Sequence, residues 1–266
     1  DEYHKVSEDN KALYGVMTAS NILTYRDRIV YLPKIDTSKV TSMSNMFDQC
    51  SSLVAIPLID TSKVTNMSFM FVNCKSLISI PLLDTSSATN MGSMFNGCTS
   101  LISIPQLDTS NVAYMDYMFY QCSSLVAIPL IDTSKVQDMN SMFNGCLSLI
   151  SIPQLNISRF ANMNNMFNNC YSLISIPQLN TSIINMNNQF KNCKSLTHAN
   201  LKGVAIACGL NNSALLSKES LLYLINNEAA TSAITITLAS YAYERLANDA
   251  DVVAALANHP NISIAQ

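Results

Sequence analysis

The stretch "SMFNGC" occupies Ser93 to Cys98 and recurs letter for letter at Ser141 to Cys146. The two copies are 48 positions apart, and near copies lie between them and on either side at a spacing of 24. Self-similarity at a fixed period indicates a repeat protein, in which each copy is one structural unit stacked on the next. The sequence therefore predicts an array of 24-residue coils.

Three residue types recur at this period. The tripeptide Asp-Thr-Ser occurs in five units, and in two more units Asn replaces its Asp. The first residues of these segments are Asp36, Asp60, Asp84, Asp108, Asp132, Asn156 and Asn180. Proline recurs at Pro33, Pro57, Pro81, Pro105, Pro129, Pro153 and Pro177. Cysteine recurs at Cys50, Cys74, Cys98, Cys122, Cys146 and Cys170, and Cys193 follows one residue early. We call a set of residues related by this period a column and name it after its first member.

The apolar spacing within a unit fits neither the helical period of about 3.6 nor the strand period of 2, so each unit consists of several short pieces. Leu53 to Ile56 is rich in β-branched residues and ends at a proline, which predicts a short strand whose Leu and Ile are buried on the next coil. A second extended piece is expected at Val64 to Met67. The Met-x-x-Met-Phe-x-x-Cys stretch is expected to close one helical or 3₁₀ turn with Met and Phe inward. Asp-Thr-Ser is expected to form a turn cap that faces water, and a calcium ladder is the alternative.

The cysteine column has two interpretations. Stacked coils bring its members within about 5 Å of one another, which is compatible with disulfides. Equivalent side chains point the same way, however, and this favours buried free thiols over a bridge or a metal site. Cys208 stands outside the column. The methionines lie beside Phe at regular spacing, so we expect them in the core and not on a soft binding surface.

The flanks of the array are predicted to be caps, because the end coils of an array otherwise expose core and strand edges. Residues 1–28 are expected to form a helical cap with Ser7 as N-cap and Leu13 on the apolar face. Residues 29–201 form the array. Residues 202–266 are expected to form atypical repeats and a cap. Within them, a helix should start at Ser217, a strand is expected at 234–238, a helix at 252–256 and a strand at 261–264.

Composition excludes several functions. The net charge is -3 without a Lys/Arg cluster, which argues against nucleic acid as a partner. No apolar run approaches the roughly 18 residues of a membrane helix, so no transmembrane segment is expected. The histidines are only His4, His198 and His259, and glycines total six, so neither a catalytic constellation nor a phosphate-binding loop is indicated. We therefore expect no enzymatic activity, cofactor or metal.

The repeat "MFDQCSSLVAIPLIDTSKVTNMSFMF" resembles that of the BspA-like leucine-rich-repeat bacterial surface proteins, formerly a domain of unknown function. The similarity covers about residues 29–201. It implies an α/β fold, a right-handed leucine-rich-repeat solenoid with one short parallel β-strand per 24-residue coil. It also implies a bacterial cell-surface or secreted location, with a lipid anchor upstream as one route, and binding of a host or bacterial surface protein or glycan. The array is expected to be monomeric.

Two surface features suggest where a partner binds. Tyr114, Tyr117 and Tyr120 replace the small polar residues of other units and form a candidate binding patch; the alternative is that they pad the convex side. The residue after the strand proline is Leu in some units and Gln in others, and these are expected to line the other face. A structural spacer or phage-derived surface component is the alternative function.

Overall fold

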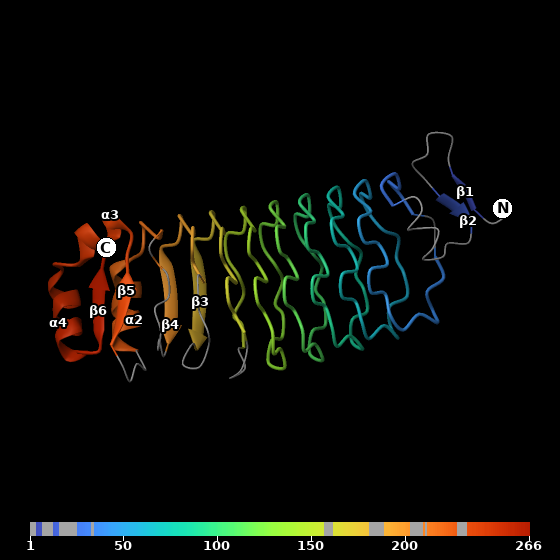
Figure 1. Ribbon diagram of the computed structural model, residues 1–266. Helices are drawn as coiled ribbons and strands as arrows, with labels where there is room; N and C mark the ends of the chain where they lie inside the picture. The colour runs from blue at the N-terminus through green and yellow to red at the C-terminus, as the bar shows by residue number, and fades with distance from the viewer. Residues whose placement is uncertain are drawn as a thin grey trace.

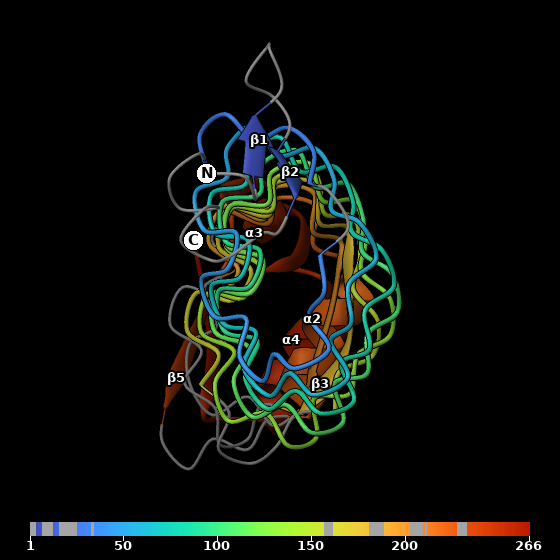
Figure 2. The ribbon, with the colours of Figure 1, turned by 90° about the vertical axis from the view of Figure 1, so that its right-hand side faces the viewer.

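The computed structural model of this 266-residue chain shows stacked coils in a single row. The residues that it describes are 4–6, 13–15, 26–32, 35–156, 162–180, 189–202, 210, 212–227 and 233–266. In Figure 1 the row ends in β1 and β2 on the N-terminal side and in the helices on the C-terminal side. In Figure 2, which looks along the row, successive coils superpose as a ring. The predicted period therefore corresponds to one revolution of the chain.

Helices and strands occupy a small part of the described chain. The strands are β1 (His4–Val6), β2 (Leu13–Gly15), β3 (Ser175–Asn180), β4 (His198–Lys202), β5 (Ile234–Thr237) and β6 (Ile262–Ala265). The helices are α2 (Lys218–Asn226), α3 (Ser240–Leu246) and α4 (Ala250–Asn258). The strands pair two by two: β1 with β2 is antiparallel, and β3 with β4 and β5 with β6 are parallel.

The predicted N-terminal helix is wrong where the structure can be compared with it. Leu13 lies in β2 and pairs with Val6 of β1. Val6 and Tyr14 are strand-favouring residues, and the pairing of Val6 with Leu13 and of Lys5 with Tyr14 is incompatible with a helix through Leu13. Ser7, the expected N-cap, falls outside the described residues.

Main-chain hydrogen bonds join each coil to both of its neighbours. In the coil around Phe95, the amides of Met91, Ser93, Phe95 and Gly97 donate to carbonyls of the following coil at 2.7–3.0 Å. The amide of Ile102 donates to Ile78 O of the preceding coil at 3.2 Å. Because the same bonds recur from coil to coil, the array is one continuous hydrogen-bonded body.

The expected strand at Leu53 to Ile56 is shorter than predicted in most coils. Among the described coils, regular strand pairing in this segment occurs only at β3 and β4, and elsewhere a single amide-to-carbonyl bond such as that of Ile102 joins the segments. The proline that ends the segment has no amide hydrogen and interrupts the ladder, so that even in β3 the register shifts between Ile176 and Leu179, across Pro177. The second expected piece forms a parallel ladder of bridges from Ser42 through Asn66 and Asn90 to Asn162.

The Met-Phe-Cys stretch is a pair of tight turns and not a helical turn. Met94 N bonds Met91 O and Cys98 N bonds Phe95 O, as in 3₁₀ geometry. However, Ser93 and Gly97 within these turns have positive φ angles of 57° and 75°. Positive φ at the third residue is typical of a type II turn. These conformations turn alternate amides toward the next coil, where they find their acceptors.

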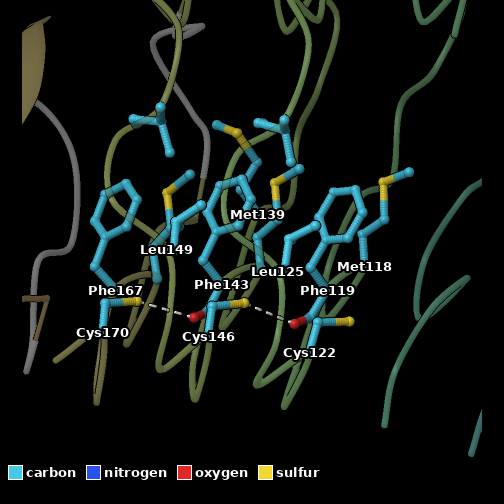
Figure 3. Close-up of a cluster of buried hydrophobic side chains, with 14 of the residues drawn as sticks. Met118, Phe119, Cys122, Leu125, Met139, Phe143, Cys146, Leu149, Phe167 and Cys170 are labelled. Atoms are coloured by element: carbon cyan, nitrogen blue, oxygen red, sulfur yellow. Dashed lines mark hydrogen bonds between the residues drawn. The ribbon is translucent and has the colours of Figure 1, made fainter. Parts of the chain in front are cut away.

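The core consists of stacked columns, as predicted. Phenylalanine rings from Phe47 to Phe190 stack with centroids 5.3–5.7 Å apart and interplanar angles of 2–13°. Buried Met, Leu and Ile columns surround them. Figure 3 shows Phe119, Phe143 and Phe167 in one such row above their cysteines. Each side chain thus packs on its own copy in the next coil, which is why the sequence repeats so strictly.

The C-terminal elements follow the sequence closely. α2 starts after Ser217, whose side chain accepts from Ser220 N, and α2 packs on β4 and α4. β5, α4 and β6 lie where strand, helix and strand were expected, and α3 is an additional helix. Lys218 of α2 forms ion pairs with Asp249 and Asp251 at 3.3 and 2.9 Å, which ties the first turn of α2 to that of α4.

Candidate binding surface

The three tyrosines lie on one coil but differ in exposure. Tyr114 is 46% exposed, whereas Tyr117 and Tyr120 are half-buried. The rings of Tyr117 and Tyr120 contact each other edge to face with centroids 5.5 Å apart, and Asn140 of the next coil donates to the Tyr117 hydroxyl at 2.9 Å. The structure thus brings Tyr117 and Tyr120 into contact.

Tyr117 occupies an unusual backbone position for an aromatic residue. Its φ angle is 55°, in the column whose other members are Asn45, Phe69, Ser93, Ser141 and Asn165. A left-handed conformation costs an L-residue about 1–2 kcal/mol, and Asn tolerates it best. Because the same positive φ recurs throughout this column, it belongs to the turn of each coil, and Tyr117 adopts it together with its counterparts.

A second surface consists of apolar side chains that sequence reasoning placed in the strand without recognising their exposure. The second residue of each Leu-x-x-Ile segment points outward, and we call this column the apolar row. Its members are Val54, Ile78, Ile102, Val126, Ile150 and Ile174. Those from Ile78 onward are 39–50% exposed. The sequence contained a signal for this exposure. The second and fourth residues of the segment are β-branched and flank a small third residue, and only the first and fourth residues are needed for the core.

An open groove of about 1140 Å³ lies over the N-terminal coils, on the Asp-Thr-Ser side of the segment. Its apolar part includes Leu58 and Leu82, which are 69% and 63% exposed. Gln106 continues the Leu58 column at one end of the groove, so the residues after the strand proline do line a face. None of the three tyrosines belongs to this lining.

Exposed carboxylates border the same groove. They belong to Asp36, Asp60, Asp84 and Asp108. Each forms the predicted turn cap, in which Oδ1 accepts from the amide and hydroxyl of the serine two residues on, as in Asp84 with Ser86 at 3.1 and 2.7 Å. The hydroxyl and amide of Ser62 lower the pKa of Asp60, and those of Ser110 lower the pKa of Asp108. The carboxylates of Asp60 and Asp108 are therefore ionised at neutral pH.

The cysteine column is the predicted row of free thiols. The seven column members are buried and unbridged, and each thiol from Cys74 onward donates to the carbonyl of a phenylalanine in the preceding coil at 3.0–3.1 Å. Figure 3 shows two of these bonds as dashed lines, from Cys146 to Phe119 and from Cys170 to Phe143. Burial raises the pKa of Cys50 and of Cys193 to about 12, so the thiols stay protonated. Cys208 lies outside the described residues.

The described part of the chain contains no group of three or more His, Cys, Asp or Glu side chains that could hold a metal ion. His198 is exposed at the start of β4, where its Nδ1 lies 2.7 Å from Thr197 Oγ1. In the same described residues, no helix has both the length and the apolar character needed to cross a membrane.

The repeat itself decides the family. The model described as "Mycoplasma protein of unknown function, DUF285" matches residues 24–128 and 102–204, which together span more than half of the chain. The chain belongs to this family. These are the BspA-like leucine-rich repeats, and the array is accordingly a leucine-rich-repeat solenoid. BspA-like and other leucine-rich-repeat proteins are generally macromolecular interaction modules.

Solved structures that the BspA-like chain is similar to are also leucine-rich-repeat proteins. One from T. pallidum (TpLRR) is 17% identical, with 86% of this chain and 96% of that chain covered and a TM-score of 0.45. One from Bacteroides ovatus is 18% identical, with 90% and 61% covered and a TM-score of 0.36. One from Eubacterium ventriosum is 14% identical, with 80% and 89% covered and a TM-score of 0.32. No curated protein matches the chain by sequence. All three TM-scores lie below 0.5, and the family assignment rests on the repeat match.

Proposed function

We propose that this chain is a non-enzymatic recognition protein, at the bacterial cell surface or secreted, that binds a host or partner macromolecule through its solenoid surface. The apolar row is the observation that carries the proposal. An aliphatic side chain exposed singly needs no explanation, but contiguous exposed apolar surface marks interaction sites. Here the row continues through six coils without a charged member.

The surroundings of the apolar row suit a flat protein contact. Its neighbours one residue on are Ala or Ser in every coil, such as Ser79, Ser103 and Ala127, and these expose little beyond a methyl or a hydroxyl. The coils beneath are hydrogen-bonded to one another, so the row is held rigid before a partner arrives. Preorganisation of this kind lowers the entropic cost of binding.

Tyr114, Tyr117 and Tyr120 are proposed as a second contact zone. The exposure of Tyr114 and the contact between the rings of Tyr117 and Tyr120 support this role. Tyrosine offers a large rigid surface and a hydroxyl at low entropic cost, which suits both protein and sugar ligands.

The test is a glycan and extracellular-protein array probed with the chain and three variants. The row variant is Ile102→Ser with Ile150→Ser, and its matched control is Ser103→Ala with Ser151→Ala, on the same coils at the adjacent exposed position. The tyrosine variant replaces all three tyrosines by Ser. We expect the row variant to lose at least about tenfold in affinity for a ligand that the control retains, because two exposed isoleucines are removed from the contact.

Three results would count against the proposal. Equal binding by the row variant and its control would contradict a role for the apolar row. Unchanged binding by the tyrosine variant would leave those residues as padding of the convex side. No ligand for any form of the chain would favour the alternative, a structural spacer whose contacts lie elsewhere. Fractionation of cells that express the chain natively tests the location, and recovery in the cytosol would contradict it.

A further inference from the structure

The groove is confined to one half of the array, although its columns run through all of it. In later coils, Gln154 and Gln178 occupy the column that contains Leu58 and Leu82. Asn156 and Asn180 replace the aspartates of the earlier coils. Gln154 turns back on the array, since its Nε2 donates to main-chain carbonyls at 2.7 and 3.1 Å, and Gln106 at the end of the groove does the same. Within the groove, the exposed Leu58 and Leu82 lie beside the carboxylates of Asp60 and Asp84, whereas the equivalent pair Leu130 and Asp132 lies outside it.

Three carboxylates of the groove, those of Asp60, Asp84 and Asp108, form no ion pair with a lysine among the described residues. Lys63 donates to the main-chain carbonyl of Ser38 at 3.0 Å, and Lys135 donates to Asn111 Oδ1 at 2.9 Å. Three residues after Asp84 the chain has Ser87, at the position where three other units have lysine. The groove is consequently a negatively charged surface with an apolar floor.

A buried hydroxyl in the same lining lacks a partner. Thr37 and Thr85 donate to the carbonyl of the next Asp along the array at 2.7 and 2.8 Å. Thr61 lies between them in the column and lines the groove, and it is 1% exposed with no hydrogen-bond partner for its hydroxyl among the described residues. Thr61 thus differs from the neighbouring threonines of its column at the wall of the groove.

The spacing of the charges specifies the occupant further. Coils are 5.3–5.7 Å apart at the phenylalanine rings. Every second carboxylate is therefore separated by roughly 11 Å, close to the ~9 Å that one turn of three residues spans in a polyproline II chain, where every third side chain faces the same way. Cationic side chains at every third position of a segment extended as polyproline II would match this repeat, and an apolar residue between them would meet the leucines.

We propose that the groove over Leu58, Leu82, Asp60, Asp84 and Asp108 binds an extended segment of a partner protein with Lys or Arg at every third residue and apolar side chains between. This inference rests on the proposed function and names the partner chemistry for one part of the solenoid. The leucines provide the contact area, and their burial under the segment shields the ion pairs from water. The carboxylates fix the direction and spacing of the basic residues.

The test uses a fluorescent peptide of four Lys-Leu-Ser repeats with blocked termini, and its affinity is measured by anisotropy. The first variant is Asp84→Asn with Asp108→Asn, and its matched control is Asp132→Asn, which lies in the same column outside the groove. The second is Leu82→Ser, matched by Leu130→Ser, which is equally exposed and also outside the groove. Thermal unfolding followed by circular dichroism verifies that each variant is folded.

We expect the double Asp variant and Leu82→Ser each to weaken binding about fivefold, since exposed ion pairs and partial apolar burial contribute modestly. Both controls should leave the affinity unchanged. Raising the salt from about 0.05 M to about 0.5 M should weaken binding to the unmodified chain, because the Debye length shortens. A Glu-Leu-Ser peptide should not bind.

Several outcomes would overturn the inference. An equal loss of peptide affinity in Asp132→Asn would mean that the peptide binds along the whole aspartate column and not in the groove. Absence of peptide binding to the unmodified chain would contradict the proposed site. Tighter binding of spermine than of the peptide would indicate that the occupant of the groove is a polyamine and not a polypeptide. If array ligands still depend on the apolar row while the groove variants have no effect, the proposed function survives and this inference fails. If the peptide binds to the groove but no array ligand is found, this inference survives and the proposed function fails.

Discussion

At the scale of single residues, the cysteine column shows why a small polar atom recurs inside an apolar core. Cys122 is fully buried and its thiol donates to Phe95 O at 3.1 Å. That carbonyl also accepts from Cys98 N within its own turn at 3.0 Å, so the thiol is its second donor and supplies a bond between coils. Leucine or alanine in the column would fill or empty the space but could not make this bond.

Replacing Cys122 by Ala should lower the free energy of unfolding by about 2 kcal/mol, from the lost hydrogen bond and the small cavity together. Burial raises the pKa of the Cys122 thiol, with repulsion from Cys146 adding to it. In a Cys208→Ser background, the native chain should therefore resist iodoacetamide at about pH 8.5, where an ordinary thiol is half ionised. Urea unfolding and mass spectrometry measure the two effects. Rapid labelling of the native column would contradict the buried position.

Sequence reasoning succeeded for the cysteines because the argument needed only the period. If coils stack, equivalent side chains point the same way and cannot converge on a bridge. The hydrogen bond to the phenylalanine carbonyl could not be predicted, since it depends on where the main chain of the preceding coil places that oxygen. The exposure of Ile102 and its column was missed for a related reason: Leu-x-x-Ile shows which residues are apolar but not how the chain turns between them.

At the scale of elements, the tight turns of the Met-Phe-Cys stretch replace the expected helical turn. Their i to i+3 hydrogen bonds are those of a 3₁₀ turn, which is why apolar spacing alone suggested one. The distinguishing signal is the recurrence of Asn and Gly in the Gln49 column, at Asn73, Gly97, Gly145 and Asn169. These residue types favour positive φ. Aromatic residues such as Tyr117 in the neighbouring left-handed column obscured the pattern.

Gly145 tests the turn geometry. Its φ angle is 81°, and a Cβ added there would lie 3.2 Å from Cγ of Gln121. Gly145→Ala should therefore lower the free energy of unfolding by about 1–2 kcal/mol, the cost of a left-handed conformation for an L-residue. Asn144→Ala, next to it at negative φ, should change it by less than about 0.5 kcal/mol. Urea denaturation compares the pair, and equal losses would show that positive φ carries no cost at this turn.

At the scale of the whole molecule, the division into residues 1–28, 29–201 and 202–266 remains a proposal, in which the flanks protect the ends of the array. The packing of α2 on β4 supports the C-terminal part of it. The groove could not be predicted from the period, because a period describes what the coils share. The groove arises from the few positions at which N-terminal coils differ from later ones, such as Leu82 against Gln178. The effect of these differences depends on which side chains are exposed, and the sequence does not show this.

The coil as the unit of stability can be tested by excision. Deleting residues 109–132 joins Asp108 to Thr133 in register, so every column stays continuous and the chain should fold. Its urea m-value should fall by roughly a tenth, because m scales with the surface exposed on unfolding and one coil is lost. Deleting only residues 109–120 removes half a period and places buried Met and Phe positions against polar ones, so this variant should not unfold cooperatively. Circular dichroism during urea titration distinguishes the two. Equally cooperative unfolding of the half-coil deletion would mean that the stacking of like residues does not determine the fold, and the surfaces defined by those columns would lose their basis with it.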